Sequence, residues 1–71
     1  MDIMFDQRAD ALYIKFQPAG DKVKETIKLK DGLLVDISKD NKLFGIEILD
    51  ASKRIPSKEL SHVNINFPSA E

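Results

Sequence analysis

Apolar and polar residues alternate with a period of two along most of this chain. The pattern is clearest in residues 11–16, where every second side chain is apolar: Leu12, Ile14 and Phe16. The same period recurs in residues 24–29, 33–37 and 43–49. Because successive side chains of a β-strand point to opposite faces, these segments predict strands that each turn one face toward a core.

Turn signals separate these segments. Residues 7–10 have the length and polarity of a hairpin loop after a short first strand at 3–5, residues 18–21 contain Pro and Gly, and Asp31-Gly32 predicts a tight hairpin turn. We therefore expect a mainly β fold, an antiparallel five- to six-stranded meander sheet. The sixth strand corresponds to the alternation of Val63, Ile65 and Phe67 with polar residues.

One or two short helical turns are expected after the fifth strand. Asp50 occupies an N-cap position, where its carboxylate could accept hydrogen bonds from the free backbone N–H groups of residues 51–54. Pro56 removes a backbone donor, and Ser57 could begin a second turn that includes Leu60. The sequence thus predicts two brief turns rather than one long helix.

Size and composition favour a single small domain over residues 1–71. A domain this short buries only about 60% of the surface of its unfolded chain, so its core is thin. The chain has 71 residues, of which 42% are hydrophobic and 32% charged, which is typical of a folded protein. It has no cysteine that could form disulfides. The remaining routes to stability are idealised packing and self-association, and we expect a homodimer.

Charge and hydropathy exclude several functional classes. Eleven basic and twelve acidic residues are spread along the chain, and no aromatic residues interleave with the lysines, so we expect no nucleic-acid partner. Uninterrupted apolar runs such as Leu33-Leu34-Val35 are far shorter than a membrane span. The N-terminal residues lack the pattern of a signal peptide. We therefore expect a cytoplasmic protein without membrane contact.

The chain contains two sequence blocks in this order: Ala9-Asp10-Ala11-Leu12-Tyr13 and residues 45–52 (Gly-Ile-Glu-Ile-Leu-Asp-Ala-Ser). Leu34-Val35-Asp36 lies between them. In these blocks residues 5–54 resemble a family of short prokaryotic proteins known as domain of unknown function 2283. The resemblance implies a compact β-rich fold. It also implies, as one candidate role, an antitoxin-like protein with a small protein partner encoded by a neighbouring gene. It supplies no catalytic residues, and residues 55–68 extend beyond the commonest form of the family.

Four acidic residues are candidate polar groups: Asp10, Asp36, Glu47 and Asp50. Asp10 can bond backbone donors of the first hairpin loop and Asp50 can cap a helix, so we interpret both as structural. Asp36 and Glu47 share one face of neighbouring strands, where Lys15 is a candidate ion-pair partner. His62, the only histidine, excludes a histidine-cluster zinc site and is expected at the surface. We predict no catalytic residue, no cofactor and no metal.

Both faces of the predicted sheet are partly apolar. The helical turns and residues 63–67 could cover the face that carries most of the aliphatic side chains. The other face is then a candidate interface with a second copy, and it contains Tyr13, Leu34, Leu43 and Leu49. The leading hypothesis is a non-catalytic interaction module, a homodimer or one subunit of a partner complex. The alternative is a small-ligand or enzymatic site around Asp36, Glu47 and Tyr13. Residues 55–68 could pack within one chain or swap between protomers.

Overall fold

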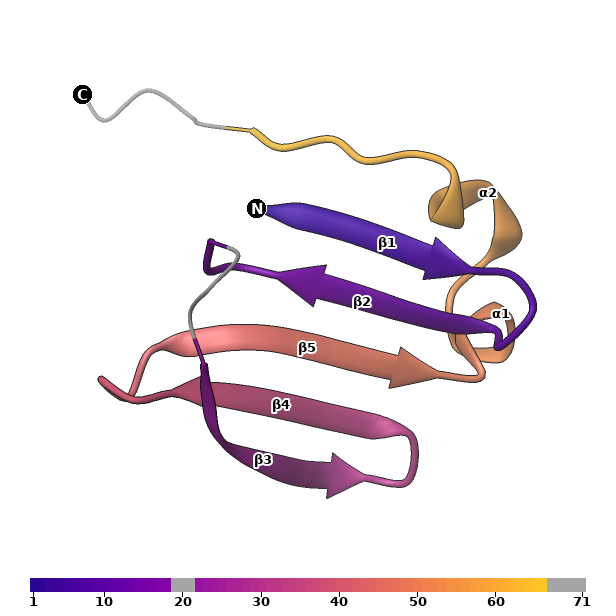
Figure 1. Ribbon diagram of the computed structural model, residues 1–71. Helices are drawn as coiled ribbons and strands as arrows, with labels where there is room; N and C mark the ends of the chain where they lie inside the picture. Colours follow the sequence, from indigo (N-terminus) through magenta and orange to yellow (C-terminus); the bar gives the residue numbers. More distant parts are fainter. Residues whose placement is uncertain (19–21, 67–71) are drawn as a thin grey trace.

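A computed structural model describes residues 1–18 and 22–66 and contains one antiparallel sheet followed by two helical turns (Figure 1). The expected five strands and two turns are confirmed. Their bounds are β1 Asp2–Asp6, β2 Ala11–Lys15, β3 Val23–Lys30, β4 Leu33–Ser38, β5 Leu43–Leu49, α1 Ala51–Arg54 and α2 Ser57–Leu60. The turn predicted at 18–21 falls largely outside the described residues.

The strand order is β1-β2-β5-β4-β3, which is not a simple meander. β1 and β2 form one hairpin, and β3, β4 and β5 form a meander that joins it through β5. β5 therefore lies in the centre of the sheet, while β1 and β3 are its two edges. All pairs are antiparallel, so the predicted fold class holds although the order differs.

One face of the sheet is apolar across all five strands. Cross-strand partners lie side by side on the same face, and the register aligns one aliphatic residue from each strand in a single row. The row consists of Ile3, Ile14, Ile46, Val35 and Ile27. A second row on the same face contains Phe5, Leu12, Ile48 and Leu33. We call this surface the apolar face, and the opposite surface, which carries Tyr13, Asp36 and Glu47, the polar face.

The core is thin, as the chain length predicts. Among the described residues the buried hydrophobic side chains are Leu12, Phe44 and Ala51, and no large side chain is fully buried. The ends of the aliphatic row are open, with Ile3 exposed to 40% and Ile27 to 42%. The sheet is thus a single layer, whereas stable domains usually pack two layers against each other.

The two helical turns cover only one end of the sheet. They follow β5 directly, at the end where the β1–β2 hairpin and the β3–β4 turn also lie (Figure 1). Arg54 of α1 connects the helical turn to this end of the sheet, because its side chain donates hydrogen bonds to the carbonyl oxygens of Leu49 and Asp31. The adjacent Gly32 has a φ of 79° and sits against the Arg54 guanidinium, which explains why the tight turn needs glycine.

The start of α1 is capped by a residue other than the expected one. Asp50 adopts the left-handed conformation, with a φ of 52°, and its side chain accepts no capping hydrogen bond. Asp10 takes that role, because its carboxylate accepts hydrogen bonds from the backbone N–H of Ser52 at 3.0 Å and from the Ser52 hydroxyl at 2.7 Å. The hairpin-loop role expected of Asp10 belongs to Asp6. The roles assigned to Asp10 and Asp50 were therefore both wrong, although Asp10 is structural.

The sixth strand is not formed within the described residues. Residues 62–66 follow α2 without strand pairing, and Phe67 lies outside the described range. Val63 and Ile65 are exposed to 57% and 53%. This segment therefore does not cover the apolar face as the sequence pattern suggested.

The capping role of Asp10 is testable with a matched pair of variants. Asp10→Asn removes one of the two carboxylate acceptors but keeps a residue type that tolerates the left-handed backbone. We expect urea denaturation to show a free energy of unfolding lower by about 1 kcal/mol. Asp50→Asn, which changes a carboxylate without capping contacts, should cost less than about 0.5 kcal/mol. Equal effects at the two positions would contradict the assignment.

Candidate functional site

A hydrogen-bonded cluster of polar side chains occupies the centre of the polar face. Tyr13 extends from β2 across β5, and its hydroxyl donates a hydrogen bond of 2.7 Å to Asp36 Oδ2 on β4. The Thr26 hydroxyl on β3 donates a hydrogen bond of 2.6 Å to Asp36 Oδ1. Both carboxylate oxygens of Asp36 thus accept a hydrogen bond, one from the adjacent strand β3 and one from β2 on the far side of β5, and the cluster joins β2, β4 and β3 across the sheet.

Gly45 makes room for this cluster. It lies in β5 as the cross-strand partner of both Lys15 and Asp36, so its Cα is directly under the path that Tyr13 takes to Asp36. A Cβ at position 45 would overlap the Tyr13 hydroxyl and ring and would approach the Ile14 carbonyl oxygen to 2.9 Å. Glycine at the centre of a strand signals such a close approach.

The electrostatics of the cluster favour a neutral tyrosine. Partial burial, the hydrogen bond to Asp36, and the negative charges of Asp36 and Glu47 raise the pKa of Tyr13 to about 12. All these effects disfavour the phenolate. At neutral pH Tyr13 is therefore a hydrogen-bond donor, and it is not activated as a base or nucleophile.

The ion pair expected between Lys15 and the acidic residues of this face is not present. Lys15 shares the face with Asp36 and Glu47, but Asp36 is satisfied by Tyr13 and Thr26. The ion pairs between described residues are Lys28 with Asp31 and Lys42 with Asp40. The hydroxyl groups of Tyr13 and Thr26 already donate to Asp36, which removes the need for a long cationic side chain at this carboxylate.

The predicted interface residues are only partly brought together. Register places Tyr13, Leu34 and Leu49 on the polar face, with Glu47 between Tyr13 and Leu34. Leu43 comes at a register shift between β4 and β5 and is exposed to 48%. Polar side chains therefore interrupt the apolar residues of this face, in contrast to the unbroken rows of the apolar face.

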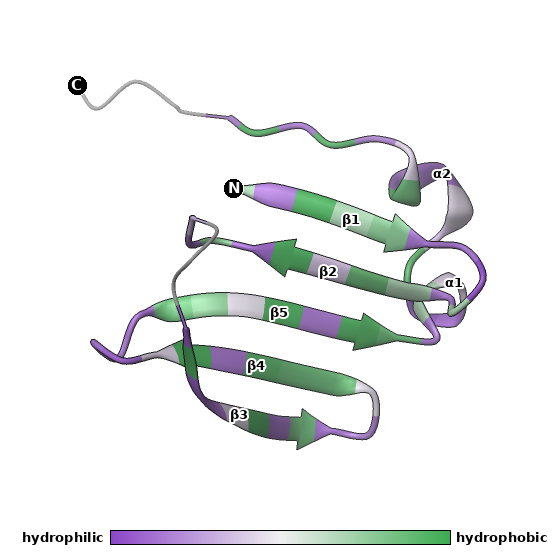
Figure 2. Ribbon diagram, in the orientation of Figure 1, coloured by the Kyte–Doolittle hydropathy of each residue, from purple (hydrophilic) through white to green (hydrophobic). Residues whose placement is uncertain are grey.

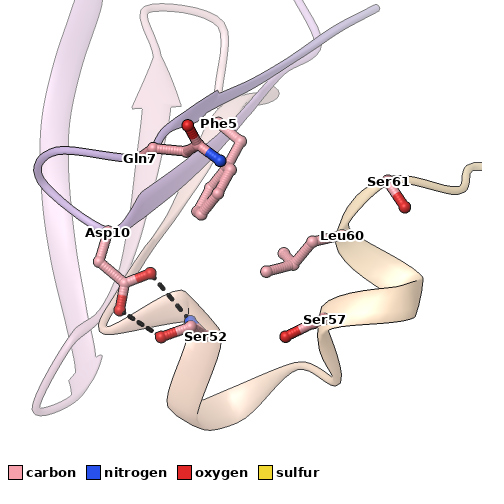
Figure 3. Close-up of a pocket in the computed structure, with 7 residues that line it drawn as sticks. All are labelled: Phe5, Gln7, Asp10, Ser52, Ser57, Leu60 and Ser61. Atoms are coloured by element: carbon pink, nitrogen blue, oxygen red, sulfur yellow. Dashed lines mark hydrogen bonds between the residues drawn. The ribbon is translucent and has the colours of Figure 1, made fainter.

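A cleft of about 540 Å³ lies between the first hairpin and the helical turns. Phe5 of β1 and Leu60 of α2 both point into it (Figure 3), and polar groups surround them. Its lining consists of Phe5, Gln7, Asp10, Ser52, Ser57, Leu60 and Ser61. The carboxylate in this cleft, that of Asp10, is held by Ser52. The hydroxyl groups of the three serines can donate and accept hydrogen bonds in this cleft.

No group of three or more His, Cys, Asp or Glu side chains within residues 1–18 and 22–66 is arranged to hold a metal ion. His62 is exposed, and it is distant in sequence from Asp36 and Glu47. In the same ranges, no helix is long and apolar enough to cross a membrane.

Comparison with protein families gives a match over residues 2–52 to a family described as "Protein of unknown function (DUF2283)". The chain belongs to the DUF2283 family. Comparison with curated proteins and with solved structures gave no match. The DUF2283 match includes all five strands and α1 up to Ser52, so both the Asp36 cluster and the Asp10 cap lie within the family region. Residues 53–71 lie beyond it.

Sequence reasoning singled out Tyr13, Asp36 and Asp10 but missed Thr26, Gly45 and Ser52. A glycine inside a strand was the available signal for Gly45. The sequence offered no comparable signal for Thr26, because threonine is common on the solvent-exposed face of any strand. In this DUF2283 protein the resulting cluster stabilises the sheet and leaves no unpaired group on Asp36 aimed at a ligand.

The packing of Tyr13 over Gly45 predicts a strong coupling between the two positions. Gly45→Ala should lower the free energy of unfolding by about 2 kcal/mol, because the new methyl group displaces the Tyr13 ring. In a Tyr13→Ala background the same change should cost less than about 1 kcal/mol, since the ring is absent. A double-mutant cycle by urea denaturation measures the difference, and identical costs in both backgrounds would disprove the contact.

The raised pKa of Tyr13 predicts a loss of stability at alkaline pH. The unfolded chain has a tyrosine pKa near 10, so between about pH 10 and pH 12 the folded protein retains a proton that the unfolded chain releases. The free energy of unfolding should fall through this range. Tyr13 is the only tyrosine, so the absorbance of tyrosinate reports its titration directly.

The matched control is Tyr13→Phe, which should lack this component of the alkaline decline and should lose about 1 kcal/mol at neutral pH. A folded-state titration midpoint near 10 would show that the hydroxyl does not donate to Asp36.

Proposed function

We propose that this protein is a non-catalytic interaction module that forms a homodimer by stacking the apolar faces of two copies. The observation that carries the proposal is the aliphatic row that crosses all five strands of a one-layered sheet. Sheets with one apolar face pack face to face at a distance of about 10 Å, which gives each sheet its second layer.

Two measures of shape support a missing layer. A compact protein of 8.0 kDa exposes about 4,450 Å². This chain exposes 5716 Å², which is about 1,270 Å² more. Its radius of gyration is 13.6 Å, against about 11 Å for a compact domain of this length. The unpaired residues 62–66 and the open ends of the aliphatic row both add to the exposed surface. A standard dimer interface covers about 800 Å² per partner.

The polar face is the weaker candidate for the interface. The interface predicted at Tyr13, Leu34, Leu43 and Leu49 assumed that residues 63–67 cover the apolar face, and the exposure of Val63 and Ile65 removes that premise. Docking on the polar face would bury Glu47 and Asp36 together with their charges, which is costly unless a partner compensates for them. The aliphatic rows at the centre of the apolar face contain no charged side chain, so their burial does not carry this cost. Glu25 of β3 lies at the margin of this face.

The geometry gives little support to an enzymatic or ligand-binding role around Asp36, Glu47 and Tyr13. The Tyr13 hydroxyl and both Asp36 oxygens are engaged with one another and with Thr26. The cleft described above and a smaller one lined by Lys22, Ser38, Lys39 and Asp40 contain none of the three residues. A binding site requires groups that remain free to contact a ligand, and Tyr13 and Asp36 already bond to each other.

Neighbouring residues on opposite faces of β4 provide a matched test. Val35→Thr introduces a hydroxyl on the apolar face with little change of shape or strand propensity, whereas Leu34→Thr changes the polar face. We expect the wild-type chain to sediment at twice its 8.0 kDa mass at tens of micromolar. Val35→Thr should raise the dissociation constant of the dimer about 30-fold, because each of the two copies loses about 1 kcal/mol of binding free energy. Leu34→Thr should leave it nearly unchanged.

Circular dichroism of each variant, measured at the same concentration, confirms that the chain is folded. A strictly monomeric wild-type protein would contradict the proposal. So would dissociation by Leu34→Thr but not by Val35→Thr, which would place the interface on the polar face.

A further inference from the structure

Residues 62–66 have the sequence of a strand but no strand partner. Val63 and Ile65 alternate with polar residues, and the alternation is visible beyond α2 in Figure 2. Both apolar side chains are more than half exposed. Exposed β-branched residues at every second position are typical of a strand whose partner is missing.

The sheet offers one unprotected edge for such a strand. Edge strand β3 carries three lysines and two register shifts, devices that discourage further pairing. Edge strand β1 has neither lysine nor proline and pairs with β2 in unbroken register from Asp2 to Asp6. Its outer N–H and C=O groups are therefore open to an added strand.

Residues 62–66 leave α2, and the side of the sheet on which α2 lies decides where this segment starts. Phe5, a member of the apolar face, points into the cleft bounded by Leu60 of α2 (Figure 3), so α2 lies on the apolar side of the sheet. A helix packed on a sheet lies at a height similar to that of a second stacked sheet, about 10 Å. A chain that leaves α2 thus begins near the level where the sheet of a stacked second copy would lie.

We propose that residues 62–66 form an exchanged arm that adds a sixth strand to β1 of the second copy. The inference rests on the stacked dimer proposed above, and it identifies residues 62–66 as an element that stabilises this dimer. In this pairing Val63 and Ile65 extend the aliphatic row of the partner beyond its edge residue Ile3. Ladder hydrogen bonds and two apolar side chains then stabilise the dimer in addition to the stacked faces.

Isotope-filtered nuclear Overhauser spectroscopy on an equimolar mixture of ¹³C-labelled and unlabelled wild-type protein tests the exchange. We expect intermolecular contacts between the methyl groups of Val63 or Ile65 and those of Ile3 or Met4. Intermolecular contacts from Ile46 and Val35 without any from Val63 and Ile65 would overturn the arm and leave the dimer intact. A sample without intermolecular contacts would overturn both proposals.

Substitution of the arm provides a second readout, and its exposed positions pose little risk to folding. The double variant Val63→Thr/Ile65→Thr retains strand propensity but removes apolar surface, and it should raise the dimer dissociation constant about tenfold. The matched control Asn64→Thr/Asn66→Thr changes the polar positions of the same segment and should alter the constant less than about twofold. Equal effects of the two double variants would overturn the arm.

Discussion

The need for a second layer governs this molecule. A β-sheet that presents aliphatic side chains from every strand on one face must bury that face, because exposed apolar area costs about 25 cal/mol per Å². In the part of the chain that the structure describes, two helical turns, α1 and α2, follow β5, and they reach one end of the sheet. The thin core, the open ends of the aliphatic row and the large exposed surface all follow from this one deficiency. The second copy in the proposed dimer is the simplest source of the missing layer.

The polar face explains why the two sides of the sheet are not equivalent. Tyr13, Asp36 and Thr26 satisfy one another across three strands, with Gly45 providing the space, so this face is stable in contact with water. Such a cluster ties distant strands together without requiring a partner. Under the proposal above, this asymmetry leaves the apolar face to associate. Within the family region, Asp36 and Asp10 accept hydrogen bonds that hold the sheet and the start of α1.

Local patterns predicted the local structure well. Period-two alternation located β2 to β5, a short apolar run before a hairpin loop located β1, and Pro56 separated the two helical turns as expected. The strand order was beyond such reasoning, because the pairing of β2 with β5 depends on contacts distant in sequence. The cap of α1 was missed for the same reason, since it comes from Asp10 and not from the adjacent Asp50. The strand predicted from the alternation at 63–67 is not formed within the described residues, because a strand also needs an edge to pair with.

Solvent accessibility of individual methyl groups tests the central claim most directly. A soluble paramagnetic probe accelerates the relaxation of methyl groups that water can reach. If two apolar faces are stacked, the methyl groups of Ile14, Val35 and Ile46 should be strongly protected well above the dissociation constant and should lose that protection on dilution. Leu34, on the polar face, should relax rapidly throughout. Equal relaxation of Val35 and Leu34 at every concentration would contradict the account.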